Sequence, residues 1–175
     1  MDEAVTDLPP GRECGTCTLC CKLFPVPELE KPAGRWCRHI AQGRGCGIHE
    51  TRPEICRAFF CQWVYNADLG PEWKPEVSRF VLSIYPGSNS LVVTADPGAP
   101  AAWRAEPYLR NLRRWAEAAL AQGDQVLVMH GARATAILPD REVELGEIGA
   151  GDRIATYRGP GGYDVKRIPA GAANG

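Results

Sequence analysis

Cysteine is absent from residues 62–175, although the 175-residue chain holds eight cysteines. The chain also lacks any apolar run near the roughly 20 residues that a membrane helix needs. Its start, MDEAVTDLPPGRE, has no basic segment followed by an apolar one, so we expect no secretory signal and a cytoplasmic protein. A formal net charge of −1 argues against a generally basic nucleic-acid binder.

Several catalytic motifs are missing as well. The sequence has no phosphate-binding glycine loop, no Gly-x-Ser-x-Gly turn and no His-Glu-x-x-His pair. It shows no arrangement of a nucleophile with an acid or base partner either. These absences favour a binding protein over an enzyme that acts on its own.

All eight cysteines lie between Cys14 and Cys61. In a secreted peptide an even number of cysteines would suggest disulfides. In a reducing compartment persistent disulfides are uncommon, and metal ligation or redox chemistry is the better interpretation. The abrupt end of the cysteine-rich stretch agrees, because a disulfide scaffold would have little reason to stop at Cys61.

The first four cysteines share one short stretch, C-G-T-C-T-L-C-C. If residues 15–22 are helical, each residue advances about 100° around the axis. Cys14, Cys17, Cys20 and Cys21 then fall in one arc of roughly 120°, which packing alone explains poorly. Neighbouring residues rarely reach one tetrahedral ion, so Cys20 and Cys21 either bind different metals or only one of them binds.

The other four cysteines are Cys37, Cys46, Cys56 and Cys61. Thr51 as N-cap, with Pro53 in the first turn and Glu54 three residues on, predicts a helix that contains Cys56 and ends near Cys61. Ile55, Phe59 and Phe60 would form its apolar side. Glycines around Cys46 would let the backbone turn tightly at a metal.

Basic residues exceed acidic ones between Cys14 and Cys61, by seven to four. A tetrathiolate zinc site or an oxidised four-iron cluster carries a net charge of about −2. Cations near the thiols would offset that charge and keep the thiol pKa values low. The candidates are Lys22, Arg38, Arg52 and Arg57, and a solvated surface is an equally good explanation for any one of them.

These residues carry a family resemblance. The run C-G-T-C-T-L-C-C, then W-C, then C-G-I-H-E-T-R-P-E-I-C-R-A-F-F-C resembles the CxxCxxCC cysteine-cluster family of zinc- or iron-chelating (YkgJ-like) proteins, over roughly residues 14–63. The resemblance implies eight metal ligands: Cys14, Cys17, Cys20, Cys21, Cys37, Cys46, Cys56 and Cys61. A similar cluster in bacterial flagellin lysine methylases implies iron–sulfur chemistry in one branch.

This chain departs from the family at two points. His49 stands where an aromatic Tyr is more usual, and nothing beyond the cysteines resembles a methyl-transfer domain. His49, three residues after Cys46, could complete a Cys₃His site. A lone histidine beside a metal is more often a neighbour of the ligands than a ligand, and His39 and His130 are weaker candidates still.

Residues beyond the cysteines predict short regular elements. Residues 62–76 are rich in Trp and Pro and predict a connecting loop. An amphipathic helix runs from Pro107 and closes at Gly123. Trp103, Tyr108 and Trp115 are expected core residues, whereas the arginines of this helix (Arg110, Arg113 and Arg114) are better explained as a solvated face than as a binding surface. Alternating apolar residues predict strands at 77–85, 90–95, 125–130, 133–138, 141–145, 153–158 and 163–168.

The predicted architecture is therefore α+β. Residues 14–63 form an irregular cysteine module with short helices that is stapled by metal. Residues 77–168 form a small antiparallel sheet with one amphipathic helix. Residues 1–13 and 169–175 are expected to be disordered tails.

Three functions follow from this pattern. The favoured one is metal binding through the cysteines, with zinc or an iron–sulfur cluster in a structural or redox role. The alternatives are a thiol–disulfide oxidoreductase that uses Cys14 and Cys17, and an accessory protein to a modification enzyme. The expected partner is the metal or cluster, with a protein partner left open and neither membrane nor nucleic acid expected.

Overall fold

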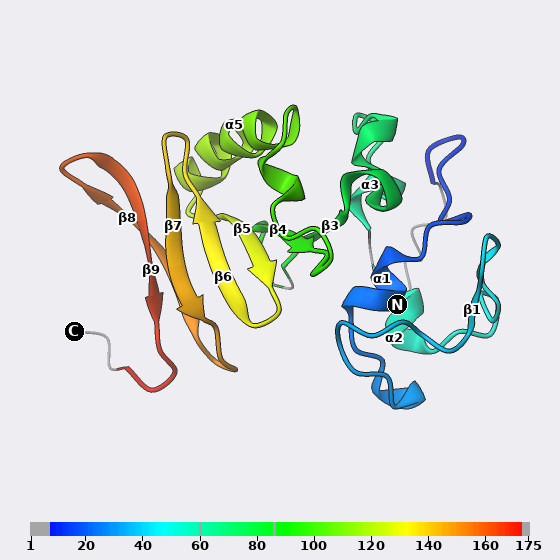
Figure 1. Ribbon diagram of the computed structural model, residues 1–175. Helices are drawn as coiled ribbons and strands as arrows, with labels where there is room; N and C mark the ends of the chain where they lie inside the picture. Colours follow the sequence, from blue (N-terminus) through cyan, green and yellow to red (C-terminus); the bar gives the residue numbers. More distant parts are fainter. Residues whose placement is uncertain (1–7, 60, 86, 173–175) are drawn as a thin grey trace, which may run out of the picture.

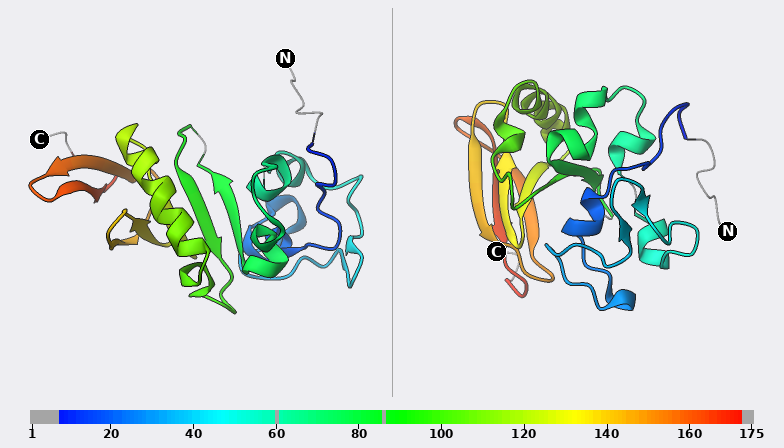
Figure 2. Two further views of the ribbon diagram at one scale, coloured as in Figure 1. Left: turned by 90° about the horizontal axis from the view of Figure 1, so that it is seen from above. Right: turned by 45° about the vertical axis from the view of Figure 1, so that its right-hand side comes forward.

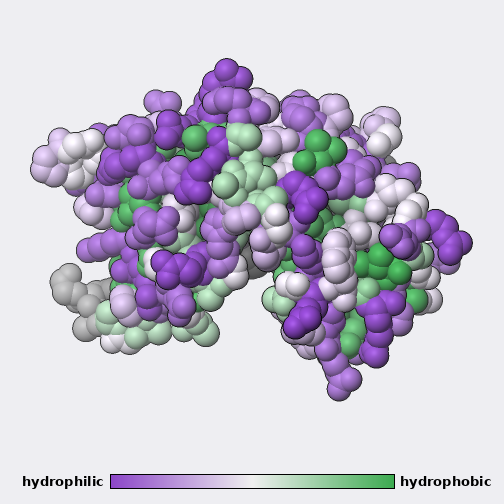
Figure 3. All heavy atoms as spheres, in the orientation of Figure 1, coloured by the Kyte–Doolittle hydropathy of each residue, from purple (hydrophilic) through white to green (hydrophobic). Residues whose placement is uncertain are grey.

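The computed structural model describes residues 8–59, 61–85 and 87–172. Two parts lie side by side, the cysteine module at the right of Figure 1 and the β-rich region at the left. The space-filling view shows a notch between them at the lower edge (Figure 3). Short helices combined with small sheets confirm the α+β class. No helix among the described residues is both long and apolar enough to cross a membrane.

The cysteine module consists mainly of turns and very short elements. Its helix α1 spans Leu19–Leu23 and is followed by a 3₁₀ turn, Pro27–Leu29. A two-residue hairpin joins β1 (Ile40–Ala41) to β2 (Gly45–Cys46). Elements this short cannot bury a continuous apolar face, so the module needs other interactions to hold its shape.

Helix α2 differs from its prediction. It spans only Glu54–Arg57, with Pro53 in the N-cap position and no side-chain cap. The capping box at Thr51 is therefore wrong, because the Thr51 amide closes an earlier turn by donating to the Ile48 carbonyl at 3.0 Å. Cys61 does not end this helix; it is the N-cap of the next one, α3. Phe60 lies outside the described residues.

The connecting loop predicted for residues 62–76 is also wrong. This segment contains α3 (Gln62–Tyr65), a 3₁₀ turn (Pro71–Trp73) and the start of α4 (Pro75–Ser78). Trp63 and Trp73 are buried, and their packing stabilises turns that local sequence would not hold. Pro71 and Pro75 each begin a helical turn, where the missing amide hydrogen costs nothing.

The main sheet has five strands in the order β3-β4-β5-β6-β7. Neighbours are antiparallel except β4 and β5, which are parallel because α5 (Tyr108–Ala121) crosses between them. The sheet is therefore mixed rather than wholly antiparallel. Its strands are β3 Phe80–Ile84, β4 Leu91–Ala95, β5 Val126–His130, β6 Arg133–Ile137 and β7 Glu142–Glu147.

A separate hairpin extends the sheet region beyond β7. Strands β8 (Arg153–Gly159) and β9 (Gly162–Ile168) pair antiparallel along their whole length. Val165 of β9 is buried against Leu127 and Leu138 of the sheet region. Figure 2 shows this hairpin at the end of the molecule furthest from the cysteine module.

The core lies between the sheet and α5, and its aromatic centre confirms the expected anchors. Trp103 is fully buried, Tyr108 is buried, and Trp115 is partly buried against them. Trp73 meets Tyr108 and Trp115 with ring centroids 5.0 and 4.9 Å apart. Sequence-distant aromatic rings thus hold α5 and the 62–76 segment on one face of the sheet.

Strand β3 joins the two regions because its side chains alternate between faces. Phe80 and Leu82 enter the aromatic core, whereas Val81 points to the other face and packs against Leu19 and Leu23 of α1. Val81 is fully buried there. The cysteine module is therefore seated on the face of β3 opposite α5.

Candidate metal centre

Helix α1 lies at the centre of the cysteines. It carries Cys20 and Cys21, whose sulfur atoms are 4.0 Å apart. The amide of Cys37 donates to the carbonyl of Cys21 at 3.2 Å, which brings a segment sixteen residues away in sequence beside α1. All eight cysteines are free thiols.

A glycine contact brings the β1–β2 hairpin to the first cysteines. Gly45 has φ +90° and lies directly on the backbone of Gly15, where an added Cβ would be 2.2 Å from the Gly15 carbonyl oxygen. Only glycine allows this approach. Cys46 is therefore held near the segment that begins at Cys14, and the close approach at Gly45 is to protein backbone.

A small cavity lies on the sheet side of α1. Its lining combines four cysteines with apolar side chains, namely Cys14, Cys17, Cys20, Cys61, Trp63, Val64, Pro75 and Val81. Its volume is about 20 Å³. A water-sized particle needs about 10–15 Å³, so this space holds about one such particle.

Thiol acidity differs sharply between the adjacent cysteines of α1. The hydrogen bond between them, together with burial, raises the pKa of Cys20 well above its usual value. The same bond lowers the pKa of Cys21 to about 7, assisted by the charges of Lys31 and Arg52. Near neutral pH Cys21 is therefore a better thiolate than Cys20.

The cysteines on the sheet side of α1 are poor thiolates without metal. Burial raises the pKa of Cys61 to about 11 and also raises the pKa values of Cys14 and Cys17. On the other side, burial raises the pKa of Cys56, and nearby Cys21, Cys37 and Cys46 raise it further. Ligation of a metal by such thiols would release protons, so the affinity for a metal would rise with pH.

Lys31 is a buried cation without an acidic partner. It is 7% exposed, and its ammonium donates to three backbone carbonyls, those of Lys22, Phe24 and Pro32. No Asp or Glu of the described chain forms an ion pair with it. Burial lowers its pKa, and the cysteine charges that oppose this shift are those of Cys21, Cys37, Cys20 and Cys56. A buried cation needs a counter-charge, and thiolates are the nearest source.

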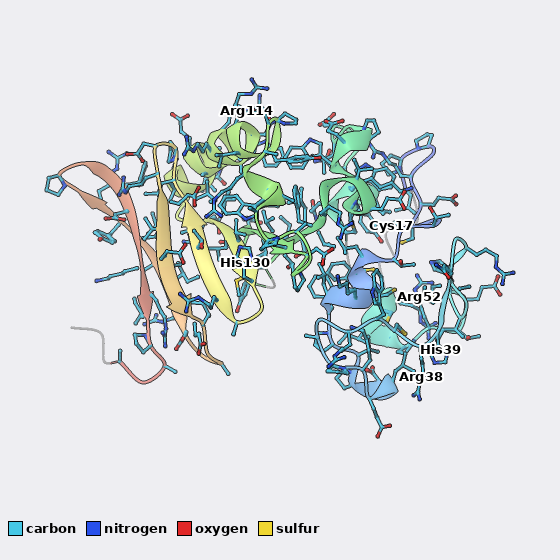
Figure 4. The ribbon with its side chains drawn as sticks, in the orientation of Figure 1. Cys17, Arg38, His39, Arg52, Arg114 and His130 are labelled. Carbon is cyan, nitrogen blue, oxygen red and sulfur yellow. The ribbon has the colours of Figure 1, made fainter. Side chains whose placement is uncertain are left out.

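Arg52 is the second cation of the site. Its guanidinium contacts His49 Nδ1 at 3.1 Å and also donates to the His49 carbonyl. Its charge lowers the pKa of both Cys14 and Cys21. Figure 4 places Cys17 on the α3 side of α1, and Arg52 and His39 on the opposite side. The Nδ1 atom of His49 thus contacts Arg52, and nothing in the described residues makes His49 a metal ligand.

The eight thiols are chemically suited to bind a metal, but their present positions do not form a binding site. As the side chains stand in residues 8–59, 61–85 and 87–172, no three Cys, His, Asp or Glu side chains converge on a point that could hold an ion. Cysteine has one rotatable side-chain torsion, and a change of rotamer redirects its sulfur. Metal binding therefore requires rotamer changes within a backbone that already gathers the thiols.

Sequence reasoning missed two features of the site. In the sequence Lys31 looks like an ordinary surface lysine before a proline. Only its burial in the structure identifies it as a buried cation beside the thiols. Asp96 on the sheet side is 1% exposed and pairs with Lys22 of α1 at 2.5 Å and with Arg79 at 2.6 Å. Lys22, expected to balance thiolate charge, therefore fixes the module to the sheet.

Comparison with known proteins adds no further identification. No family model, curated protein or solved structure matches this chain.

Proposed function

We propose that this chain is a metal-binding protein whose eight cysteines hold zinc in a structural role. The observation that carries the proposal is that four sequence segments bring free thiols around α1, beside a buried lysine that has no acidic partner within the described residues. Thiolates bound to a divalent ion would supply the missing negative charge. The resemblance to the CxxCxxCC cysteine-cluster family supports the same conclusion.

Zinc is favoured over an iron–sulfur cluster because zinc is the usual ion of closed sites made of four cysteines. The second candidate is an iron–sulfur cluster with a redox role, which the resemblance to the methylase branch supports.

The thiol–disulfide oxidoreductase has less support. An attacking cysteine needs a low pKa, whereas burial raises the pKa values of both Cys14 and Cys17. Cys21, the one cysteine with a lowered pKa, has Cys20 as its immediate neighbour in the chain. An accessory role to a modification enzyme rests on the resemblance alone.

The test is metal and sulfide analysis of protein purified without air. We expect zinc at one or more ions per chain, no acid-labile sulfide and no absorbance in the visible range. Iron with an equal amount of sulfide and a brown colour would replace zinc by the cluster. A well-folded cysteine module without any metal would reject both.

A further inference from the structure

We propose that the eight cysteines form two separate four-cysteine metal centres, divided between the adjacent residues Cys20 and Cys21. The inner centre, on the sheet side of α1, comprises Cys14, Cys17, Cys20 and Cys61. The outer centre, on the opposite side, comprises Cys21, Cys37, Cys46 and Cys56. This inference rests on the proposed metal-binding function and adds the number of centres and their ligands.

Helix geometry separates the two neighbours. Consecutive residues of a helix point about 100° apart, so the side chains of Cys20 and Cys21 leave α1 in different directions, although their sulfur atoms are 4.0 Å apart. Cys20 packs into the apolar cluster with Leu19, Leu23 and Val81, together with Cys17 and Cys61. Cys21 is not part of that cluster. It lies beside Cys37, whose amide donates to its carbonyl.

The inner set is defined by the cavity. Four of the eight cysteines line it, and its other walls are apolar side chains from α3, α4 and β3. No charged residue lines this space. A metal there would be held by four thiols against hydrophobic packing.

The outer set is defined by backbone contacts and by packing around α1. Ile40 connects Cys37 to Cys46, because its amide donates to the Cys37 carbonyl and its Cα pairs with Cys46 across the hairpin. Cys56 lies in α2, and Phe59 just beyond that helix packs on Phe24 at the end of α1 with ring centroids 4.6 Å apart. Lys31 lies beside Cys21, because its ammonium donates to the carbonyl of the next residue, Lys22, at 3.1 Å.

Cadmium binding to the full-length, metal-free chain tests the division. We expect about two equivalents per chain and two distinct cadmium resonances, since four thiolates saturate each ion. Cys20→Ser and Cys61→Ser should remove one resonance, and Cys21→Ser and Cys56→Ser should remove the other. Each variant should keep about one equivalent of tightly bound cadmium.

Several outcomes would overturn the division while leaving metal binding intact. These are a single resonance, scalar coupling between two cadmium ions through a shared thiolate, or loss of the same resonance in Cys20→Ser and Cys21→Ser. The resonance count uses the unmodified sequence, so it decides the question even if a variant fails to fold. Absence of any cadmium binding would instead reject the proposed function itself.

Discussion

The cysteine module and the sheet region obtain their stability in different ways. In the described part of residues 14–61, the buried hydrophobic residues are only Leu19, Leu23 and Val26. The sheet region has a continuous apolar core around Trp103, Phe80 and Leu112. A small segment without an apolar core needs a further constraint, such as a disulfide or a bound metal, to fold. Metal ligation by thiols can thus stabilise the cysteine module in the way that apolar burial stabilises the sheet region.

Removing the metal should produce the largest difference in stability between the two regions. Structural zinc supplies roughly 10–16 kcal/mol of apparent free energy in small zinc domains. Stripping the metal should therefore remove hydrogen-exchange protection from residues 14–61, while β4, β5 and β6 keep theirs. Exchange mapped by mass spectrometry before and after chelation measures this, with zinc re-addition as the control. Equal loss of protection in both regions would contradict the comparison.

A substitution in the apolar core tests the other side of the comparison. Trp103→Ala removes a fully buried side chain, and we expect a loss of about 3–5 kcal/mol in the free energy of unfolding. The matched control is Trp36→Ala in the cysteine module, where the side chain is 56% exposed and the loss should stay within about 0.5 kcal/mol. Urea unfolding at fixed metal content measures both. Similar losses at the two tryptophans would show that the core does not lie where we place it.

The same contrast explains what the sequence could predict. Strands β3 to β9 and α5 follow from alternation, amphipathic spacing and a closing Gly123, because each is long enough to show a period. The four-residue helices α2, α3 and α4 are too short to show one. The turns around α3 and before α4 depend on Trp63 and Trp73, which pack against residues far away in the chain, and no local pattern reveals such packing.

The membership of the candidate site stays a prediction from the sequence, whereas the arrangement of its thiols comes from the structure. Cysteine spacing identified the eight thiols and the difficulty of placing Cys20 and Cys21 on one ion. The grouping depends on long-range contacts, such as Gly45 against Gly15, that spacing does not encode. Lys31 was missed for the same reason, because its burial comes from a loop that folds back on α1.

Asp96 connects the two regions, and Asp96→Asn should weaken that connection. Burial opposes ionisation of Asp96, but hydrogen bonds from Lys22, Gly98 and Arg79 outweigh it and hold its pKa below the usual value. Loss of the charge leaves Lys22 without its partner, and we expect about 2–4 kcal/mol of destabilisation at pH 7. Asp140→Asn, at an exposed pair with Arg141, is the control and should change little.

The pH dependence of this pair has a definite sign. Because the folded-state pKa is lowered, its stabilising contribution is present above the ordinary Asp value of about 3.9 and is lost as the pH falls through the folded-state value. Unfolding curves between neutral and acid pH should therefore converge for the native sequence and Asp96→Asn. If the free energies of unfolding of the two proteins differ by the same amount down to the most acid pH, the charge of Asp96 does not link the two regions.

Lys31→Met should have the smallest of these effects and bears most directly on the cysteine module. Met keeps a long apolar side chain but removes the buried cation beside Cys21, Cys37 and Cys56. Loss of a residue that supports metal ligands typically weakens metal binding by about 10–100-fold, and the lower end is expected here because Arg52 remains. Competition against a zinc chelator at pH 7 measures the change.

Two controls make the Lys31 result specific to charge. Lys166→Met removes an exposed lysine of β9, far from the cysteines, and should leave zinc affinity unchanged. Lys31→Arg keeps the charge and should recover part of the affinity that Lys31→Met loses. If Met and Arg at position 31 bind zinc equally well, the lysine serves packing alone, and the counter-charge of the outer centre must come from Arg52. In that case Arg52→Met should produce the loss in affinity that Lys31→Met does not.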